Sequence, residues 1–435
     1  MRHTRAIQRD RSKRPTVAPP DEKVAAHLRE LIHPATYALV AAYHERGLRH
    51  RLLTLPVMVA FVLSLIWRQI GSVSEAVRVL HQEGMLWTPP LQVSQQAVST
   101  RLRTFPASLF ERVWQEVLPV MQQRWRERTA QERPLPPALA WAHEHFTALY
   151  ALDGSTLDTL LRKVGLLREE EGPVLAGRMA ALLDVASRLP QQLWYEEDSQ
   201  AHDQRFWDKV LQVVPKGSLL LFDLGFFNFG YFARLTQQQI SFITRAKANT
   251  VYRVERVLVR QAGLRDQIIW LGAAAGQCPQ PMRLVEVLHQ GKWYRYLTNV
   301  LDPQLLPAAY VLALYWQRWR IEDAFNLVKR LLGLAYFYVG SQNGVQVQLW
   351  ATWLLYGVLV DLTDAVAAEL QQPFCTLSLE MVYRGLYHFT HAYQRGHAAD
   401  PVLYLATHAK ELGILKRKRP ASLDQLLYLT SRGIP

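Results

Sequence analysis

The spacing of hydrophobic residues changes twice along the chain, and each change predicts a change of architecture. From about 21 to 130, hydrophobic residues recur at intervals of three and four, which indicates helices with one buried face. From about 147 to 300, short apolar or alternating runs indicate β-strands separated by turns and short helices. Helical spacing returns from about 345. The pattern therefore predicts a mixed α/β protein whose α/β centre lies between two all-α regions.

Two helices of the N-terminal region are predicted at 72–80 and 94–103. The first begins with a capping box, because Ser72 is followed by Glu75 three positions later. The second begins at Ser94 with polar residues in its first turn. This pair is typical of a helix-turn-helix DNA reader. Two helices of an ordinary bundle explain it equally well, so we assign the region as a whole to DNA and name no base-reading residue.

The charge of the chain narrows the class of partner. Its 435 residues carry a formal net charge of +13, and 49% are hydrophobic, which is enough for two to four folded modules. A strongly basic protein is attracted to polyanions, either nucleic acid or an anionic membrane surface. The longest apolar runs, 55–67 and 349–360, are shorter than the roughly 18 residues that span a bilayer. We therefore expect core helices, no membrane association and a nucleic-acid partner.

The start of the chain and its cysteines bear on location. Residues 1–20 are rich in arginine and contain no apolar segment of the kind found in a signal peptide. We expect a basic flexible arm that follows the DNA backbone, although a plain disordered tail explains this composition as well. Cys278 and Cys375 are far apart and lack a metal-ligand spacing. These features predict a cytoplasmic protein with reduced thiols.

Two apolar runs of the central region end in an aspartate. Residues 147–152 precede Asp153, and residues 218–222 precede Asp223, with a glycine within two positions after each acid. A buried strand followed by a turn delivers such a carboxylate to the edge of a sheet. Either aspartate alone is more typical of a turn or a helix cap. As a pair, they are the first two candidates for an acidic site.

A third acid, Glu322, lies in a segment with an aromatic hydroxyl and two cations. On a continuous helix Tyr315, Arg318, Glu322 and Lys329 would project from one arc about 60° wide. Such a face is often only a solvated set of salt bridges. One carboxylate among cations also suits a metal bound beside phosphate. In that interpretation Arg318 and Lys329 neutralise phosphates, and Tyr315 donates its hydroxyl to the same strand.

The order of predicted elements favours the second interpretation. From residue 147 it runs strand with Asp153, strand, strand, helix, strand with Asp223, helix, strand, and finally the helix with Glu322. This is the order of the ribonuclease H-like fold, in which the three acids would meet. Before the last helix, β-branched and aromatic residues alternate between 249 and 304, which predicts a β-rich insertion.

Three carboxylates suit phosphodiester chemistry. Two divalent ions roughly 4 Å apart can activate a nucleophile and stabilise the attacking and leaving oxygens. Hard Mg²⁺ prefers oxygen ligands, so we expect Asp153, Asp223 and Glu322 to hold two Mg²⁺ ions, for which Mn²⁺ would substitute. Water would release a 3′-OH, which could then attack a second phosphodiester at the same metals.

The spacing Tyr-x2-Arg-x3-Glu-x6-Lys at 315–329 resembles the signature of DDE transposases of the insertion-sequence-four family. The similarity extends from Asp153 to about 341 and includes the segments after both aspartates. It implies cutting at the terminal inverted repeats of a transposon and joining of the ends to target DNA by a homodimeric synapse. It also implies a bacterial, nucleoid-associated location. Family members commonly carry Arg where this chain has Leu224, which removes one expected phosphate contact.

Some members of this family form a hairpin intermediate. There the β-insertion holds the transposon end, and an aromatic residue in it stacks on a flipped base. Trp293 or Trp270 could do so in this chain, although a core position explains either residue better. Trp293 is therefore a candidate DNA-binding residue together with Tyr315, Arg318 and Lys329.

The resulting prediction is a cut-and-paste DNA transposase, a metal-dependent endonuclease and polynucleotidyl transferase with a ribonuclease H-like core. Its predicted parts are a basic arm at 1–20, a helical DNA-binding domain at 21–135, the core at 136–248 and 305–345, a β-rich insertion at 249–304, and a helical C-terminal region at 346–435 for DNA binding or dimerisation. Two alternatives remain. One is a catalytically silent, transposase-derived DNA-binding protein, and the other is a ribonuclease H-like nuclease that hydrolyses without strand transfer.

Overall fold

A computed structural model describes most of the chain. The described residues are 22–45, 52–130, 135–157, 177–247, 249–272, 278–289, 291–332, 334 and 337–416. They divide into two compact units. Among these residues, a helical unit comprises those within 22–130, 156–177 and 324–416, and a sheet unit those within 135–155 and 178–323. The predicted basic arm lies outside the described residues.

The sheet unit contains the strands predicted for the central region. They are β1 (Leu149–Leu157), β2 (Gly177–Asp184), β3 (Pro190–Glu196), β4 (Leu219–Phe222), β5 (Ser241–Arg245), β6 (Tyr252–Gln261), β7 (Leu264–Leu271), β8 (Met282–His289) and β9 (Lys292–Thr298). Their order in one sheet is β3-β2-β1-β4-β5-β9-β8-β7-β6. The β4 strand is parallel to both of its neighbours, β1 and β5, and every one of its residues is buried.

The β-rich insertion is not a separate sheet. Its strand β9 pairs antiparallel with β5, and β8, β7 and β6 follow as an antiparallel meander. The insertion predicted at 249–304 therefore extends the central sheet beyond β5. The chain then enters α11 (Ala308–Trp316), which contacts both β5 and β8.

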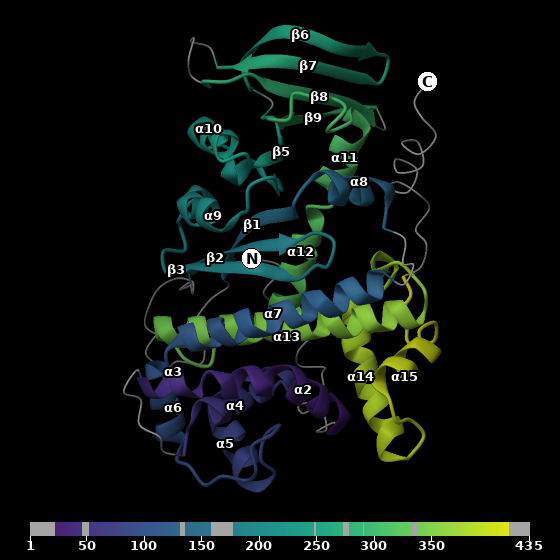
Figure 1. Ribbon diagram of the computed structural model, residues 1–435. Coiled ribbons are helices and arrows are strands. Elements are labelled where there is room, and N and C mark those ends of the chain that lie inside the picture. The colour runs from purple at the N-terminus through teal and green to yellow at the C-terminus, as the bar shows by residue number, and fades with distance from the viewer. Residues whose placement is uncertain are drawn as a thin grey trace. The chain divides into compact units, whose positions relative to one another are not determined.

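Helices cover both faces of the sheet (Figure 1). On one face lie α9 (Trp207–Val213) and α10 (Phe229–Gln237), and on the other lie α8 (Pro137–His145) and α11. Trp207 and Phe232, from α9 and α10, are fully buried against Phe222 of β4. The strands that precede the two candidate aspartates are thus packed into the core of this unit.

The helical unit joins residues from both ends of the chain. Its helices are α2 (Glu22–Ala38), α3 (Val40–Glu45), α4 (Leu55–Trp67), α5 (Val73–Gln82), α6 (Gln95–Thr104), α7 (Ala107–Ala130), α13 (Gln342–Glu369), α14 (Leu379–Gln394) and α15 (Pro401–Thr407). The long helices α7 and α13 lie side by side (Figure 1). At Gly357 of α13 an added Cβ would lie 2.5 Å from the Trp114 ring, so glycine is needed for this close approach.

Both helix starts predicted in the N-terminal region are confirmed. Ser72 caps α5 by accepting a hydrogen bond from the Glu75 N–H, and Ser94 caps α6 by accepting one from the Ala97 N–H. The connection between the two helices is held by His81, whose ring Nε2 lies 2.7 Å from the carbonyl oxygen and 3.1 Å from the amide nitrogen of Val93.

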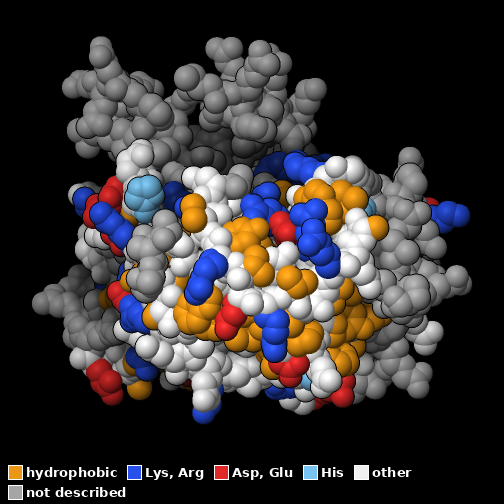
Figure 2. All heavy atoms as spheres, turned by 90° about the horizontal axis from the view of Figure 1, so that it is seen from above, with side chains coloured by type: hydrophobic (Ala, Val, Ile, Leu, Met, Phe, Trp, Pro, Cys, Tyr) orange, Lys and Arg blue, Asp and Glu red, His pale blue; other side chains and the backbone are white. Residues whose placement is uncertain are grey.

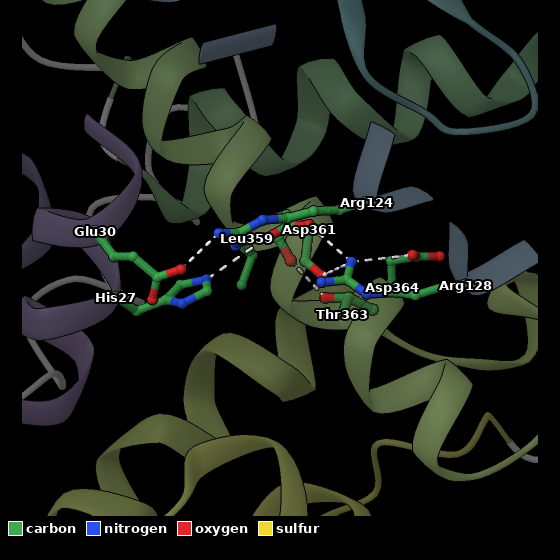
Figure 3. A network of polar contacts seen from close by, with 8 residues as sticks. All are labelled: His27, Glu30, Arg124, Arg128, Leu359, Asp361, Thr363 and Asp364. Carbon is green, nitrogen blue, oxygen red and sulfur yellow. Dashed lines mark hydrogen bonds and ion pairs between the residues drawn. The ribbon is translucent and has the colours of Figure 1, made fainter. Parts of the chain in front are cut away.

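A buried charge network ties three helices of the helical unit together (Figure 3). Asp361 of α13 is 1% exposed at its side chain and lies 2.7 Å from the Arg128 guanidinium of α7. Arg124 of α7 lies 3.4 Å from the same carboxylate and also binds Glu30 of α2. Asp364 accepts a second hydrogen bond from Arg128. Every carboxylate that these helices bury here has a cationic partner, as burial of charge requires.

Helix α13 is a core helix. It is the one helix in the described part of the chain that is long and apolar enough to cross a membrane, but 89% of its most apolar window is buried inside the protein. The predicted assignment of 349–360 to the core is confirmed by this burial.

Candidate active site

The two candidate aspartates occupy equivalent positions on neighbouring parallel strands. In the β1–β4 pair, Leu152 lies opposite Phe222. Asp153 and Asp223 are the next residues along the chain, and adjacent strands lie only about 4.8 Å apart. The prediction that the first strand ends at Asp153 is wrong, because β1 continues to Leu157 and only its pairing with β4 ends there. The sheet therefore brings both carboxylates to one edge of the β1–β4 pair.

The Asp153 carboxylate is largely enclosed. Its Oδ1 accepts a hydrogen bond of 2.9 Å from the Gly154 N–H, and its Oδ2 accepts one of 2.8 Å from Arg318. Burial raises the pKa of Asp153 to about 6, because removal of water disfavours the carboxylate by more than Arg318 favours it. This carboxylate therefore needs cationic neighbours to stay ionised at neutral pH.

Arg318 joins two of the three acids. One guanidinium nitrogen donates to Asp153, and another donates to Glu322 Oε1 at 2.6 Å. The Arg318 side chain is only 4% exposed, and its Nε–H is buried without a hydrogen-bond partner among the described residues. Burial lowers the pKa of Arg318, but Tyr315 and the carboxylates raise it by more, so the guanidinium stays charged. Asp153 and Glu322 thus bind the same guanidinium group.

Tyr315 joins the third acid. Its hydroxyl donates a hydrogen bond of 3.2 Å to Asp223 Oδ1, and the Arg318 guanidinium lies 5.8 Å from the centre of its ring. Burial is the main cause that raises the pKa of Tyr315, so the phenol remains a hydrogen-bond donor. One connected set of contacts therefore links Asp223, Tyr315, Arg318, Asp153 and Glu322.

The prediction of one continuous helix from Tyr315 to Lys329 is wrong. Tyr315 belongs to α11, Glu322 to α12 (Trp319–Asn326), and Lys329 to a π-helical turn, η4 (Leu327–Leu331). Between α11 and α12 the backbone hydrogen bonds at Gln317 and Arg318 span three residues instead of four. Such a tightened turn has an angular spacing different from that of an α-helix, so the four residues do not belong to one regular helix.

Lys329 and Trp293 have other contacts. Lys329 belongs to the helical unit, where its ammonium donates to the Thr156 carbonyl. Trp293 lies in β9, and the Arg265 guanidinium covers its ring at 4.5 Å. The large exposed aromatic next to Arg318 is instead Trp319, at 57% exposure.

A fourth carboxylate, Asp203, was not predicted. It begins the 3-10 helix η2 (Asp203–Phe206) and forms an ion pair of 2.6 Å with Arg178 of β2. Its oxygens approach the backbone at Gly154 and at Gly225, the glycines that follow the two candidate aspartates. In the sequence an acid in the first turn of a helix has an ordinary explanation as a favourable charge at a helix start, so nothing distinguished it.

The chemistry of the donor set fits a hard divalent cation, since carboxylate oxygens are what such an ion prefers. In the conformation described, however, the carboxylates are bound to Arg318 and Tyr315. Within the described ranges, no three His, Cys, Asp or Glu side chains lie close enough together to hold one metal ion. Binding of an ion by all three acids would require Arg318 to release at least one of them.

Part of the chain is similar in sequence to known proteins. Residues 176–357 match the family described as transposase DDE domain. The chain is 26% identical over 200 residues to "Putative transposase y4zB" of Sinorhizobium fredii (strain NBRC 101917 / NGR234), an alignment that covers 44% of this chain and 54% of that protein. The chain thus spans about half the length of this relative. These similarities support a transposase role.

A similar solved structure is that of the piggyBac transposase synaptic complex with hairpin DNA. The match covers 93% of this chain and 87% of the other, with 10% sequence identity and a TM-score of 0.41. At that TM-score the similarity carries no conclusion about this chain.

Proposed function

We propose that this protein is a cut-and-paste DNA transposase that uses Asp153, Asp223 and Glu322 as a metal-binding catalytic triad. The observation that carries the proposal is the pairing of Leu152 with Phe222, which sets Asp153 and Asp223 side by side, together with Arg318, which links Asp153 to Glu322. The finer family assignment to insertion-sequence-four transposases rests on the Tyr315 to Lys329 spacing.

A ribonuclease H-like core is part of this proposal. The order along the chain is β1 with Asp153, β2, β3, α9, β4 with Asp223, α10, β5 and then α12 with Glu322. This matches the order expected of that fold, and strands β6 to β9 lie between β5 and α12, where the insertion was expected. The parallel arrangement of β1, β4 and β5 supports the same assignment.

Asp153, Asp223 and Glu322 would hold two Mg²⁺ ions, or Mn²⁺ in their place. When bound, these ions would supply activation of the nucleophile and stabilisation of charge on the attacking and leaving oxygens. The protein's own part is to hold the carboxylates on a rigid sheet edge and on α12. The Asp153 side chain is 16% exposed and that of Glu322 is 30% exposed, so both carboxylates are partly shielded from water, which strengthens charge interactions at this edge.

Arg318 and Tyr315 would contact the DNA strand that is cut. If the carboxylates held metal ions, the Arg318 guanidinium would be free to bind phosphate, for which its planar fork is well suited. Its Nε–H already lacks a partner among the described residues, so it has a donor to offer. Tyr315 donates through its hydroxyl, and Lys329 would add a point charge.

The sheet unit also offers a basic surface for the DNA backbone. Strand β6 is the edge of the sheet, and its exposed side chains include Arg253, Arg256 and Arg260. Figure 2 shows Lys and Arg side chains among hydrophobic ones on a face seen from the direction of β6 in Figure 1. With the net charge of +13, these arginines support binding of double-stranded DNA, at both transposon ends and target. A homodimer would then hold two ends in one synapse.

Incubation of purified protein with Mg²⁺ and a donor plasmid carrying the transposon ends tests this proposal. We expect cut ends and products joined to target DNA. Glu322→Gln keeps the size of the side chain but removes its charge, so it should abolish cutting while DNA binding persists. The matched control Glu116→Gln, on an exposed position of α7, should cut normally.

Each other outcome of that experiment has a definite meaning. Cut ends without joined products would make the protein a nuclease. DNA binding without any cutting would make it a transposase-derived DNA-binding protein. Normal cutting by Glu322→Gln would remove Glu322 from the catalytic site.

A further inference from the structure

Asp203 lies against both backbone segments that carry the candidate aspartates, the β1 strand at Gly154 and the turn after β4 at Gly225. Its side chain is 12% exposed and belongs to the first residue of η2. Arg178 of β2 binds one of its oxygens twice, through Nε at 2.8 Å and Nη2 at 2.6 Å. The other oxygen faces Gly225. One carboxylate therefore has an anchor on β2 and two backbone neighbours.

The closeness of these neighbours is unusual. A Cβ added at Gly154 would lie 2.0 Å from Asp203 Oδ1, and one added at Gly225 would lie 2.4 Å from Asp203 Oδ2. Neither glycine has a positive φ, so space and not backbone conformation is what requires glycine here. Gly154 directly follows Asp153, and Gly225 comes two residues after Asp223.

The segment that carries Asp203 is itself fixed to the turn after β4. Gln204 donates to the Phe227 carbonyl at 3.2 Å and accepts a hydrogen bond of 3.1 Å from the Asn228 side chain. The buried Trp207 donates to the Phe226 carbonyl at 3.0 Å. Movement of Asp203 away from Gly225 would therefore break the hydrogen bonds that Gln204 and Trp207 make with the turn after β4.

We propose that Asp203 is a positioning residue, whose carboxylate, anchored by Arg178, sets the separation between the β1 strand at Asp153 and the turn after β4 that holds Asp223. The carboxylate acts as a spacer between the two glycines, and the ion pair with Arg178 fixes its orientation. This inference rests on the proposed function, because the separation matters only if both aspartates bind the same pair of metal ions. Residues of this kind are outside the ligand set yet control how well it binds.

Calorimetric titration of the full-length protein with Mn²⁺, without DNA, tests the effect on the site. Asp203→Asn preserves the volume but weakens the attachment to Arg178. We expect it to lower the Mn²⁺ affinity by roughly tenfold or more, as removal of such a supporting group does. Asp203→Glu, which keeps the charge, should recover part of the affinity. The control Asp208→Asn breaks an Asp–Arg pair of equal length, 2.6 Å, on α9 and should leave the affinity unchanged. Equal affinities for folded Asp203→Asn and wild type would overturn the proposal.

A second measurement tests the packing without any metal. Gly225→Ala should lower the melting temperature because the new methyl group meets Asp203. Adding Asp203→Ser should restore part of that loss without restoring Mn²⁺ affinity. Strictly additive losses would overturn the contact, since independent sites add. If wild-type protein bound no Mn²⁺ at all, the proposed metal site would fail, whereas the melting temperatures would still decide whether Asp203 spaces the β1 strand and the turn after β4.

Discussion

At the scale of single residues, the candidate site is governed by Arg318. Its guanidinium is nearly inaccessible and yet satisfies Asp153 and Glu322 at once. Three acids at a sheet edge would repel one another if nothing compensated their charge. Arg318 compensates the charge of two of them, and in the proposed metal site it would compete with the metal for the same oxygens.

Arg318→Gln tests this competition. Removing the guanidinium should strengthen Mn²⁺ binding by about tenfold, the equivalent of about 1.4 kcal/mol, because the ion no longer displaces a paired cation. Cleavage of DNA should nevertheless fall, since glutamine cannot neutralise the phosphate. Titration calorimetry measures the affinity, with Arg234→Gln, which breaks an exposed ion pair in the same unit, as the control. Weaker Mn²⁺ binding by Arg318→Gln would show that the guanidinium does not compete.

At the scale of elements, the spacing of hydrophobic residues predicted the strands and helices that have a buried face. Strands such as β4 and capped helices such as α5 were predicted because apolar residues and a capping serine follow fixed spacings. The tightened turn at Arg318 and the π-helical turn at Lys329 were not, because the spacing of apolar residues does not distinguish these turns from a regular α-helix. Asp153 and Asp223 each follow an apolar strand pattern, so they could be chosen as site candidates from the sequence. Asp203 follows no such pattern, so it could not.

The buried network on α7 and α13 has a consequence for stability. Burial raises the pKa of Asp361, but the neighbouring His27 and Arg128 outweigh it and leave the pKa below its usual range. The folded protein therefore binds fewer protons than the unfolded chain as the pH falls towards the unfolded pKa of about 3.9. The stabilisation is complete above that value and is lost as the pH falls through the lower, folded pKa.

Asp361→Asn should therefore destabilise the protein most at neutral pH. We expect a loss of roughly 3–5 kcal/mol, because one partner of a buried ion pair is removed and Arg128 stays behind. Below about pH 4 the difference from wild type should shrink. Thermal unfolding between about pH 3 and 7 measures this, with Glu116→Gln as a surface control. A difference that is constant over this range would contradict the ionic account.

At the scale of the whole molecule, the two main features are the net charge and the division of the described residues into two compact units. The two all-α regions predicted at 21–135 and 346–435 fall largely in one compact unit, since α7 and α13 pack together. Local patterns could not reveal this, because a helix face records that it is buried but not which helix buries it. The net charge of +13, by contrast, needs no structure to indicate a polyanionic partner.

Part of this positive charge lies on the exposed arginines of β6, and their role in DNA binding can be tested. Replacing Arg253, Arg256 and Arg260 by Gln should weaken DNA binding uniformly across sequences. It should also lower the slope of log affinity against log salt concentration by about one for each phosphate that is no longer neutralised. Fluorescence anisotropy at several salt concentrations measures the slope. Folding should be unaffected, because all three side chains are exposed. An unchanged slope would place the phosphate-binding residues elsewhere.

The most direct test of the account is to locate Mn²⁺ by anomalous diffraction in crystals of the protein bound to transposon-end DNA. We predict metal density in contact with Asp153, Asp223 and Glu322, with the Arg318 guanidinium displaced from at least one carboxylate and turned to phosphate. Metal density that is absent from these three carboxylates, with Arg318 still joining Asp153 to Glu322 on cleavable DNA, would contradict it.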